Sequence, residues 1–260
     1  MPAPALKELL EVATEAAYLA GRRTLAYFNA GVPVEIKSDN TPVTCADREA
    51  EQVIRKHITK YYPDHAIVGE EGGSTPGDKD YKWILDPIDG TKSFIYGVPL
   101  YGVLVGLEVK GVPSVGAIYM PGLDEMVNAA TGLGCKWNGR IAKVSNVSKL
   151  EDAMMLCTST VRALKRSDAF ETLANKVKYV RGWGDCYGYL LVATGRAEIM
   201  LDPAMNPWDC APMLPILQEA GGWFGDWSGK NTIWGKDGVA TNGALQKQVL
   251  EVLSKEKLKS

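Results

Sequence analysis

The sequence has few of the side chains that bind transition metals or cross-link a chain. Its 260 residues include two histidines, His57 and His65, and no cysteine or further histidine stands at ligand spacing from either. A zinc site of the Cys/His type is therefore not expected, and we expect both histidines at the surface or in loops. The five cysteines are odd in number and include no CxxC pair, which favours free thiols in a reducing compartment over a disulfide framework.

The sequence also lacks an excess of charge of either sign and a long apolar run. Its 29 basic and 31 acidic residues nearly balance, and basic residues form no long run, so the electrostatic footprint of a nucleic-acid-binding protein is missing. No apolar stretch approaches the roughly 20 residues that span a bilayer, and residues 1–10 lack the pattern of a signal peptide. We expect a cytoplasmic chain without nucleic-acid or membrane partners. The charge of an anionic substrate would have to be balanced at the binding site itself, for instance by metal ions.

What is present is an ordinary hydrophobic content of 46% and clear apolar periodicity. In the first half, helical spacing predicts an amphipathic helix over residues 6–28. A second helix is expected to begin near Asp47, whose carboxylate can cap free backbone N–H groups, and to run to Tyr61. A mainly antiparallel sheet should follow, with strands over residues 66–69, 82–85, 101–109 and 114–119.

Beyond about Val147 the pattern changes to strands and helices in alternation. Strands are predicted over residues 153–157 and 197–201, and helices over residues 167–177, 186–194, 208–220 and 243–255. We expect one compact unit with two subdomains, residues 1–147 and residues 148–260.

The most informative segment, residues 83–91, places two carboxylates three residues apart at the end of an apolar strand. Hard divalent cations prefer such oxygen ligands as Asp86 and Asp89, and the Ile88 carbonyl is in reach of the same ion. The preceding strand ends in Glu70-Glu71, so adjacent strand ends would bring Glu70 beside Asp86. Any one of these acids could be a solvated turn residue, but the complete string is too specific for that interpretation.

The step Gly90-Thr91 adds a candidate phosphate site. If a helical turn starts there, its free backbone N–H groups would point at a phosphate beside the metal ions. The Thr91 hydroxyl could also orient an attacking water.

These motifs, with Trp208-Asp209 downstream, resemble the inositol monophosphatase superfamily of magnesium-dependent phosphatases, over nearly the whole chain. The resemblance implies an α/β fold, the α/β/α/β/α sandwich of the inositol monophosphatase/fructose-1,6-bisphosphatase type, usually a homodimer. It implies two or three Mg²⁺ ions, held mostly by the first subdomain, while the second supplies substrate residues and the last ligand. The implied ligands are the side chains of Glu70, Asp86, Asp89 and Asp209 and the carbonyl of Ile88, with Asp47 beside the site, tuning the water or a third metal.

The activity implied is hydrolysis of a phosphomonoester by an activated water. With bound magnesium, Glu70 and Thr91 would activate the water and aim it in line at phosphorus, while the charge on the leaving alkoxide is stabilised. Neither a phospho-enzyme nor a histidine is needed.

Two segments indicate the substrate. Residues 89–99 and the segment Asp185-Cys186-Tyr187-Gly188-Tyr189 look like those of histidinol-phosphate phosphatases within the superfamily. Histidinol phosphate, an intermediate of histidine biosynthesis, carries an amine and an imidazole that carboxylates can hold, whereas inositol offers neutral hydroxyls. Asp185 stands where inositol phosphatases generally have a small uncharged residue, and Asp202 matches the superfamily's substrate-contacting acid. The expected substrate-binding residues are Asp89, Asp185, Asp202 and Asp209.

Several alternatives remain open at this stage. Asp185 could cap a helix before Cys186, a role compatible with substrate binding. Inositol 1-phosphate or a sugar or nucleotide bisphosphate could be the substrate, since Lys92 also occurs in bisphosphate nucleotidases. Lys37 matches a position that is often basic near the metal site in relatives, although a surface lysine is the default. A catalytically silent assembly partner is the alternative from another class, against which the complete set of acids argues.

Overall fold

The N-terminal amphipathic pattern forms helix α1 (Leu6–Thr24) in the computed structural model, which describes residues 4–255. The expected extension to residue 28 is wrong, because the chain leaves the helix after Thr24 as a series of turns. Helix α2 (Cys45–Tyr61) begins two residues earlier than expected. Its N-cap is Thr44, and Asp47 occupies the third helical position, from which its carboxylate accepts a hydrogen bond from the Thr44 backbone N–H.

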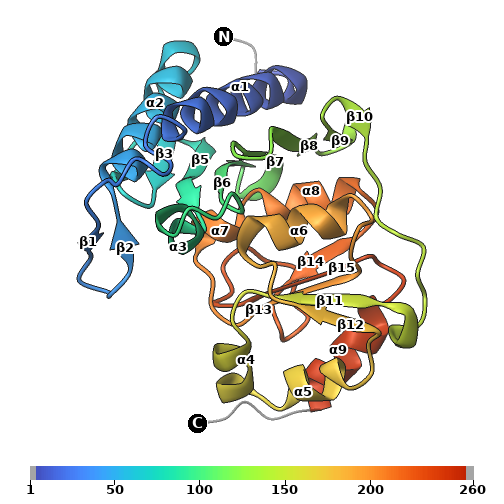
Figure 1. Cartoon of the computed structure of the whole chain (residues 1–260). Coiled ribbons are helices and arrows are strands. Elements are labelled where there is room, and N and C mark those ends of the chain that lie inside the picture. Colours follow the sequence, from blue (N-terminus) through green and yellow to red (C-terminus); the bar gives the residue numbers. More distant parts are fainter. Residues whose placement is uncertain (1–3, 256–260) are drawn as a thin grey trace.

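Helices α1 and α2 cover one face of an eight-stranded sheet (Figure 1). Among the described strands of this sheet, β3 and β5 form the parallel pair and all other neighbours are antiparallel, which confirms a mainly antiparallel sheet. In order across the sheet the strands are β10 (Arg140–Ile141), β9 (Gly134–Trp137), β8 (Glu125–Ala130), β7 (Val112–Met120), β6 (Gly102–Val109), β5 (Asp78–Asp89), β3 (His65–Gly69) and β4 (Gly73–Thr75).

The parallel pair positions the first acids. Gly69 at the end of β3 lies opposite Leu85 of β5, and the backbone N–H of Glu70 donates to the Leu85 carbonyl at 3.1 Å. Because the carboxyl ends of parallel strands meet at one sheet edge, Glu70, just after β3, and Asp86, near the end of β5, follow paired residues and lie side by side along the backbone. This confirms the expectation that the two strand ends are adjacent.

The second sheet is mixed and has five strands. The helix predicted over residues 167–177 is present but shorter, as α5 (Ala169–Ala174), and a helix that was not predicted, α4 (Thr160–Arg166), precedes it. The predicted helix over residues 208–220 is broken at Pro212, which lacks the N–H that a continuous helix needs, into α7 (Pro207–Cys210) and α8 (Met213–Glu219). The strands, in order across the sheet, are β12 (Tyr179–Arg181), β11 (Met154–Cys157), β13 (Ile199–Asp202), β15 (Gly238–Thr241) and β14 (Trp223–Gly225).

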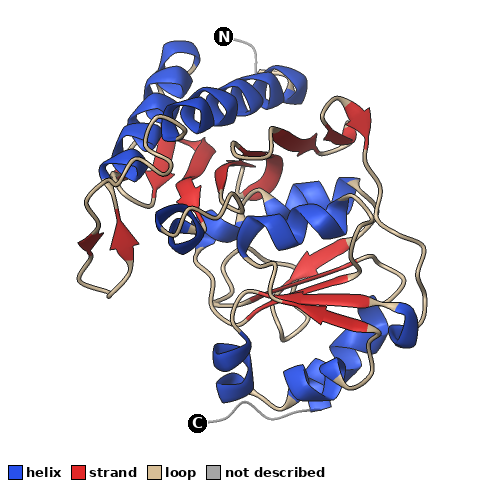
Figure 2. Cartoon of the chain, in the orientation of Figure 1, coloured by secondary structure: helices blue, strands red, loops and turns tan. Residues whose placement is uncertain are grey.

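Helices α6 (Asp185–Ala193) and α8 lie between the two sheets, and α4, α5 and α9 (Gln246–Lys255) lie beyond the second sheet (Figures 1 and 2). The layers therefore alternate as α/β/α/β/α, as predicted. One apolar cluster runs through the middle layer and joins Ile118 of the first sheet, Leu190 of α6 and Met200 of the second sheet. The predicted boundary near residue 147 falls between β10 and β11, and the division into two subdomains stays a prediction, because the halves share this core.

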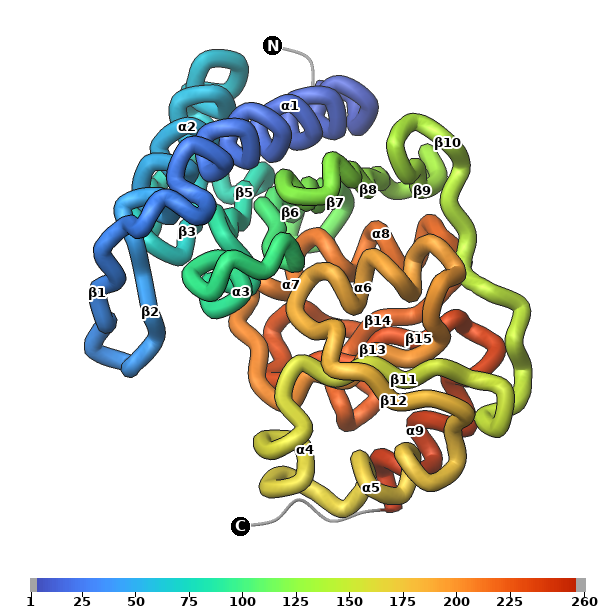
Figure 3. The backbone as a smooth tube through the Cα atoms, in the orientation of Figure 1, coloured from blue at the N-terminus to red at the C-terminus, as the bar shows by residue number. Residues whose placement is uncertain are grey.

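The remaining elements are small. Strands β1 (Glu35–Ile36) and β2 (Pro42–Val43) form a separate hairpin that projects beside α2 and β3 (Figure 3). Helix α3 (Thr91–Ile95) follows β5, and a 3₁₀ turn (Leu150–Asp152) precedes β11. All five cysteines are free, as expected. No helix formed by residues 4–255 combines the length and apolar character needed to cross a membrane.

Both histidines are buried, so the expectation that they lie at the surface is wrong. His65 begins β3, and its ring stacks between the rings of Tyr62 and Tyr81, with 4.5 Å between centroids on each side. Its Nδ1 accepts a hydrogen bond from the Trp83 indole N–H at 3.1 Å. Burial lowers the pKa of His65, although nearby Asp78 and Asp64 act in the opposite direction.

This environment predicts acid-dependent loss of stability. Because the pKa of His65 is lower in the folded protein than its ordinary value of 6.5, the unfolded chain binds the proton first as the pH falls. The contribution of His65 to the free energy of unfolding should be fully present above pH 6.5. It should decrease as the pH falls below 6.5, by at most about 1.4 kcal/mol per pH unit for one proton. Urea unfolding at pH 7.5 and 5.5 measures the loss. His65→Phe should reduce the pH dependence and His57→Gln should leave the His65 contribution; an unchanged pH dependence in His65→Phe contradicts the prediction.

Candidate metal centre and active site

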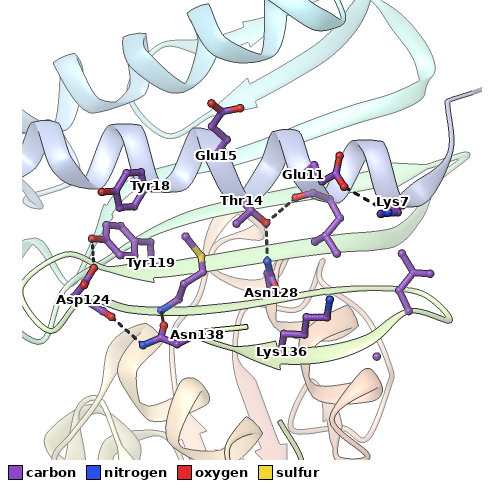
Figure 4. Close-up of a pocket in the computed structure, with 14 residues that line it drawn as sticks. Lys7, Glu11, Thr14, Glu15, Tyr18, Tyr119, Asp124, Asn128, Lys136 and Asn138 are labelled. Atoms are coloured by element: carbon purple, nitrogen blue, oxygen red, sulfur yellow. Dashed lines mark hydrogen bonds and ion pairs between the residues drawn. The ribbon is translucent and has the colours of Figure 1, made fainter. Parts of the chain in front are cut away.

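Two cavities in the described part of the chain differ sharply in their lining. One, of about 830 Å³, lies between α1 and strands β7–β9 (Figure 4). Many of its polar groups bind one another: the Asn128 amide donates to Thr14, and the Tyr119 hydroxyl donates to Asp124. The other, of about 560 Å³, opens where β3 and β5 end and is lined by acidic residues. The acidic cavity is the candidate site, and its acids are Glu70, Asp86, Asp89, Asp185 and Asp209.

Three of these carboxylates form a cluster suited to a metal ion. One oxygen each from Asp86, Asp89 and Asp209 lies within 4.8 Å of the others. In a regular strand Asp86 and Asp89 would face opposite sides, because side chains alternate with a period of two. The pairing of β5 with β6 shifts register between these two aspartates, and this irregularity brings both to one cluster.

Asp209 comes from the other half of the chain, on the short helix α7. The Asn206 backbone N–H donates to Asp209 Oδ2 at 2.7 Å, and Pro207 occupies the first turn of the helix, where its missing N–H is not needed. These local contacts fix the direction of the Asp209 side chain. The contacts of α7 with β5 and β6 then place it against Asp86 and Asp89.

Burial and mutual repulsion disfavour the ionised forms of these three carboxyl groups. Burial and mutual repulsion raise the pKa of Asp86 and of Asp89 well above the usual range, and burial raises the pKa of Asp209 to about 7. One buried and two half-buried carboxylate groups, with an oxygen of each close to the others, match the preference of hard divalent cations. The residues present therefore fit a divalent metal ion, and the acidic cluster could hold one.

Glu70 lines the same cavity but binds a lysine. The Lys37 ammonium group, next to the β1–β2 hairpin, donates to Glu70 Oε1 at 2.6 Å and to Glu71 Oε1 at 2.8 Å. Although burial acts to lower it, these hydrogen bonds hold the pKa of Lys37 above its usual value. Glu70 is not one of the three clustered carboxylates, but its charge contributes to raising the pKa of Asp86. Lys37 therefore lies beside the site rather than on open surface.

The expected helical turn after Asp89 is present as α3. Gly90 is its N-cap, with φ of 82° in the left-handed region that glycine tolerates. The Thr91 hydroxyl donates to the Ile88 carbonyl at 3.0 Å, and the Ile88 backbone N–H donates to Asp86 Oδ1 at 3.0 Å. The segment that supplies two acids is thereby folded back on itself into one rigid turn.

Gly90→Ala should lower both stability and activity. The positive φ costs an alanine about 1–2 kcal/mol. A Cβ at Gly90 would also lie 3.1 Å from the Leu100 carbonyl oxygen and 3.2 Å from Asp185 Oδ2. Gly111→Ala is the matched control, since Gly111 has φ of 78° with no atom within 4 Å of its Cβ position. Urea unfolding should show a loss in both variants, and phosphate release should fall only in Gly90→Ala; equal activity in the two would contradict the prediction.

Asp47 is buried in α2 and does not line the acidic cavity. Its carboxylate accepts hydrogen bonds from the backbone N–H and the hydroxyl of Thr44, at 2.8 and 2.7 Å. Burial raises the pKa of Asp47 to about 6. These contacts show a helix-capping residue, and its catalytic role stays a prediction.

Asp185 and Asp202 both line a recess of about 140 Å³ beside the three clustered carboxylates. Asp89 and Asp209 belong to the cluster and also line this recess. Burial raises the pKa of Asp185 to about 6 and that of Asp202 to about 7. The alternative of Asp185 as a helix N-cap is wrong, because Gly184 is the N-cap and Asp185 is the first residue of α6. The fold does bring these acids near the metal cluster, as the substrate prediction requires.

Three polar contacts in or beside this recess were not predicted from the sequence. The Thr158 hydroxyl, at the end of β11, donates to Asp202 Oδ2 at 2.7 Å and accepts from the Asp185 backbone N–H at 2.9 Å. The backbone N–H of Cys186 donates to Asp89 Oδ2 at 2.5 Å. A threonine after a strand and an ordinary backbone N–H carry no sequence signal for such roles.

Several known phosphatases are similar to the chain over nearly its whole length. The model of the inositol monophosphatase family matches residues 5–258. A histidinol-phosphatase of Chlorobaculum parvum is 42% identical, with 94% of this chain and 96% of that protein covered. A fructose-1,6-bisphosphatase/inositol-1-monophosphatase of Aquifex aeolicus is 34% identical, with 96% and 97% covered. The solved structure of an inositol monophosphatase from Anabaena superposes with a TM-score of 0.83 at 30% identity and covers 96% of each chain. The chain therefore belongs to the inositol monophosphatase family of phosphatases.

Proposed function

We propose that the chain is a magnesium-dependent phosphomonoesterase that hydrolyses L-histidinol phosphate to L-histidinol and phosphate, a step of histidine biosynthesis. The observation that carries the proposal is that the cluster of Asp86, Asp89 and Asp209 adjoins a recess with two further acids, the half-buried Asp185 and the buried Asp202. The first group suits a divalent cation and the second suits a cationic substrate. A phosphate ester with positive charge on its organic part satisfies both.

The proposed holders of two or three Mg²⁺ ions are the side chains of Glu70, Asp86, Asp89 and Asp209 and the carbonyl of Ile88. Bound magnesium supplies Lewis acidity that lowers the pKa of a water molecule and offsets the charge of the phosphate. For Glu70 to take part, its carboxylate must share or exchange the Lys37 ammonium group that it now binds. The Ile88 carbonyl accepts one hydrogen bond from Thr91 and retains a second lone pair for a ligand.

The chain's own residues would orient the attacking water and the phosphate. Because the Thr91 hydroxyl donates to Ile88, it can accept a hydrogen bond from a water and hold the water's lone pair toward phosphorus. Glu70 would receive the water's proton, and Asp47 would tune the water from α2. The free backbone N–H groups at Gly90 and Thr91 would bind phosphate oxygens, as at other helix starts.

Substrate selection is assigned to the recess. Asp185 and Asp202 would hold the amine and the imidazole of histidinol phosphate. Asp89 and Asp209, which belong to the carboxylate cluster, also line the recess and would contact the substrate. Carboxylates with raised pKa values gain more from a cationic partner than exposed ones, because the partner also offsets their desolvation. The name histidinol-phosphatase of the Chlorobaculum relative supports this choice.

A second candidate is a phosphatase for inositol monophosphate or for a sugar or nucleotide bisphosphate. Lys92 and Arg162 line the acidic cavity and could bind a second phosphate group. The Aquifex relative, named for both fructose 1,6-bisphosphate and inositol 1-phosphate, favours this alternative. A catalytically silent partner protein is the alternative of another class.

The test is a substrate panel with purified protein and Mg²⁺. We expect kcat/KM to be highest for histidinol phosphate among histidinol phosphate, inositol 1-phosphate, fructose 1,6-bisphosphate and adenosine 3′,5′-bisphosphate. A higher value for inositol 1-phosphate would overturn the substrate proposal, and no release of phosphate from any ester would support the silent alternative.

Asp185→Asn should separate the substrates. Removing this negative charge should lower kcat/KM for histidinol phosphate by roughly 10- to 100-fold, because a charge-assisted hydrogen bond to the substrate cation becomes a weaker, neutral one. Activity on inositol 1-phosphate should change far less, since inositol has no cation to hold. Asp168→Asn, outside the cavity, is the control, and an equal loss on both substrates would contradict the assigned role.

We also propose that the protein is a homodimer, in keeping with the family resemblance. Light scattering coupled to size-exclusion chromatography measures the mass, and a single species near 28.2 kDa would contradict the proposal.

A further inference from the structure

The Thr158 hydroxyl joins two acids that come from distant parts of the fold. It donates to Asp202 Oδ2 at the end of β13 and accepts from the Asp185 N–H at the start of α6, so its single proton and an acceptor lone pair are both used. Strands β11 and β13 are parallel neighbours, and Cys157 pairs with Leu201 in register, which sets Thr158 beside Asp202. Thr158 itself lines both the recess and the acidic cavity.

The backbone at Asp185 needs such a partner. Its φ is 52°, in the left-handed region that residues other than glycine rarely adopt. Gly184 before it packs against Thr158 so closely that a Cβ there would lie 2.4 Å from the Thr158 Cα. A residue is held in this conformation only where its surroundings compensate for the strain, and strain of this kind is concentrated at functional sites.

The conformation of Asp185 also affects the position of Asp89 in the carboxylate cluster. The next N–H in α6, that of Cys186, donates to Asp89 Oδ2 at 2.5 Å. Thr158 therefore stands within a chain of contacts, Asp202 to Thr158 to Asp185, that continues through Cys186 to Asp89. Loss of the Thr158 hydroxyl would leave a carboxylate oxygen and a backbone N–H without this partner.

We propose that Thr158 is a positioning residue for substrate specificity: its hydroxyl holds Asp185 and Asp202 at the separation at which their carboxylates contact the cationic organic part of the substrate. The inference rests on the proposed function, because it assumes a substrate with positive charge in the recess. It extends that proposal, since Thr158 belongs neither to the three clustered carboxylates nor to the residues assigned to the water.

The first test compares Thr158→Val, which keeps the shape and removes the hydroxyl, with Thr158→Ser, which keeps the hydroxyl. In Thr158→Val we expect KM for histidinol phosphate to rise about 10-fold or more, with kcat within about 3-fold of wild type. KM for inositol 1-phosphate should stay within about 3-fold, and Thr158→Ser should restore wild-type values for both esters. A merely structural role would move both substrates together and would not be rescued selectively.

Thr158→Ala repeats the measurement without placing a new methyl group against polar atoms, so a misfolded valine variant does not prevent a result. Circular dichroism and urea unfolding establish that each variant is folded. Wild-type KM for histidinol phosphate in folded Thr158→Ala or Thr158→Val overturns the inference.

A second readout does not depend on the substrate. Amide hydrogen exchange of Asp185 should be faster in Thr158→Val and Thr158→Ala than in wild type or Thr158→Ser, because its N–H loses the hydroxyl acceptor. If wild type does not prefer histidinol phosphate, the proposed function fails and the specificity inference fails with it, whatever the exchange shows. If wild type does prefer histidinol phosphate but Asp185 exchange and KM are unchanged in the variants, the inference alone fails.

Discussion

Replacing Asp89 by asparagine is expected to reduce phosphate release by roughly 1,000-fold or more while the fold stays intact. Asp89 belongs to the group of three carboxylates and borders the recess, so one substitution removes a proposed metal ligand and a substrate contact. The asparagine carbonyl can still accept the Cys186 N–H, so the local backbone contact survives. Steady-state kinetics with Mg²⁺ and histidinol phosphate measure the loss.

The same variant should not be less stable than wild type in the absence of divalent metal. Loss of hydration and the neighbouring carboxylates of Asp185 and Asp209 raise the pKa of Asp89, and a neutral amide removes both penalties. Urea unfolding in a metal-free buffer tests this, with Asp78→Asn, on the exposed start of β5, as the control. Wild-type activity in Asp89→Asn would refute the assignment of the site, and a large loss of stability would show that the carboxylate has a structural role instead.

Removing divalent cations is expected to abolish activity, and adding Mg²⁺ is expected to restore it. A ligand that binds only the folded state stabilises it by about 2.7 kcal/mol at 100 times its dissociation constant. Mg²⁺ should therefore also raise the free energy of unfolding of the wild type, because it relieves the repulsion among Asp86, Asp89 and Asp209. Chelation followed by titration with MgCl₂ gives both readouts.

Asp209→Asn serves as the matched control for this response. It should lose most of the Mg²⁺-dependent gain in stability, although α7 remains capped through its neutral side chain. NaCl at equal ionic strength separates metal binding from general screening of the charges. Full activity after exhaustive chelation, or an equal gain in stability from NaCl, would contradict a metal centre formed by these three residues.

The site residues with the clearest sequence signal belong to one short contiguous string. Trp83 to Thr91 contains an apolar strand, two acids and a glycine turn, and each of these features depends on neighbours only a few residues away. The adjacency of the ends of β3 and β5 could also be anticipated, because an apolar segment leads into acids in each of them. The alternating layers followed from the family resemblance rather than from periodicity.

Errors in the predicted elements have local causes that periodicity does not register. Pro212 divides what is apolar enough to be one helix, and residues 160–166 form a helix although their apolar face is short. The burial of His65 depends on Tyr62, Tyr81 and Trp83, which surround its ring from two elements. A single-residue polarity scale assigns histidine to the surface and cannot detect this.

The sequence by itself indicated which residues would carry the chemistry, because two acids between an apolar strand and a glycine turn form a pattern typical of metal-assisted phosphate chemistry. Only the tertiary structure decided that Asp209 meets Asp86, that Asp185 and Asp202 share a recess, and that Thr158 lies between those two. The physical reason is the range of the interactions. Strand and turn preferences act over a few residues, whereas these contacts join segments from both sheets and are set by the packing of α6, α7 and α8 in the shared core.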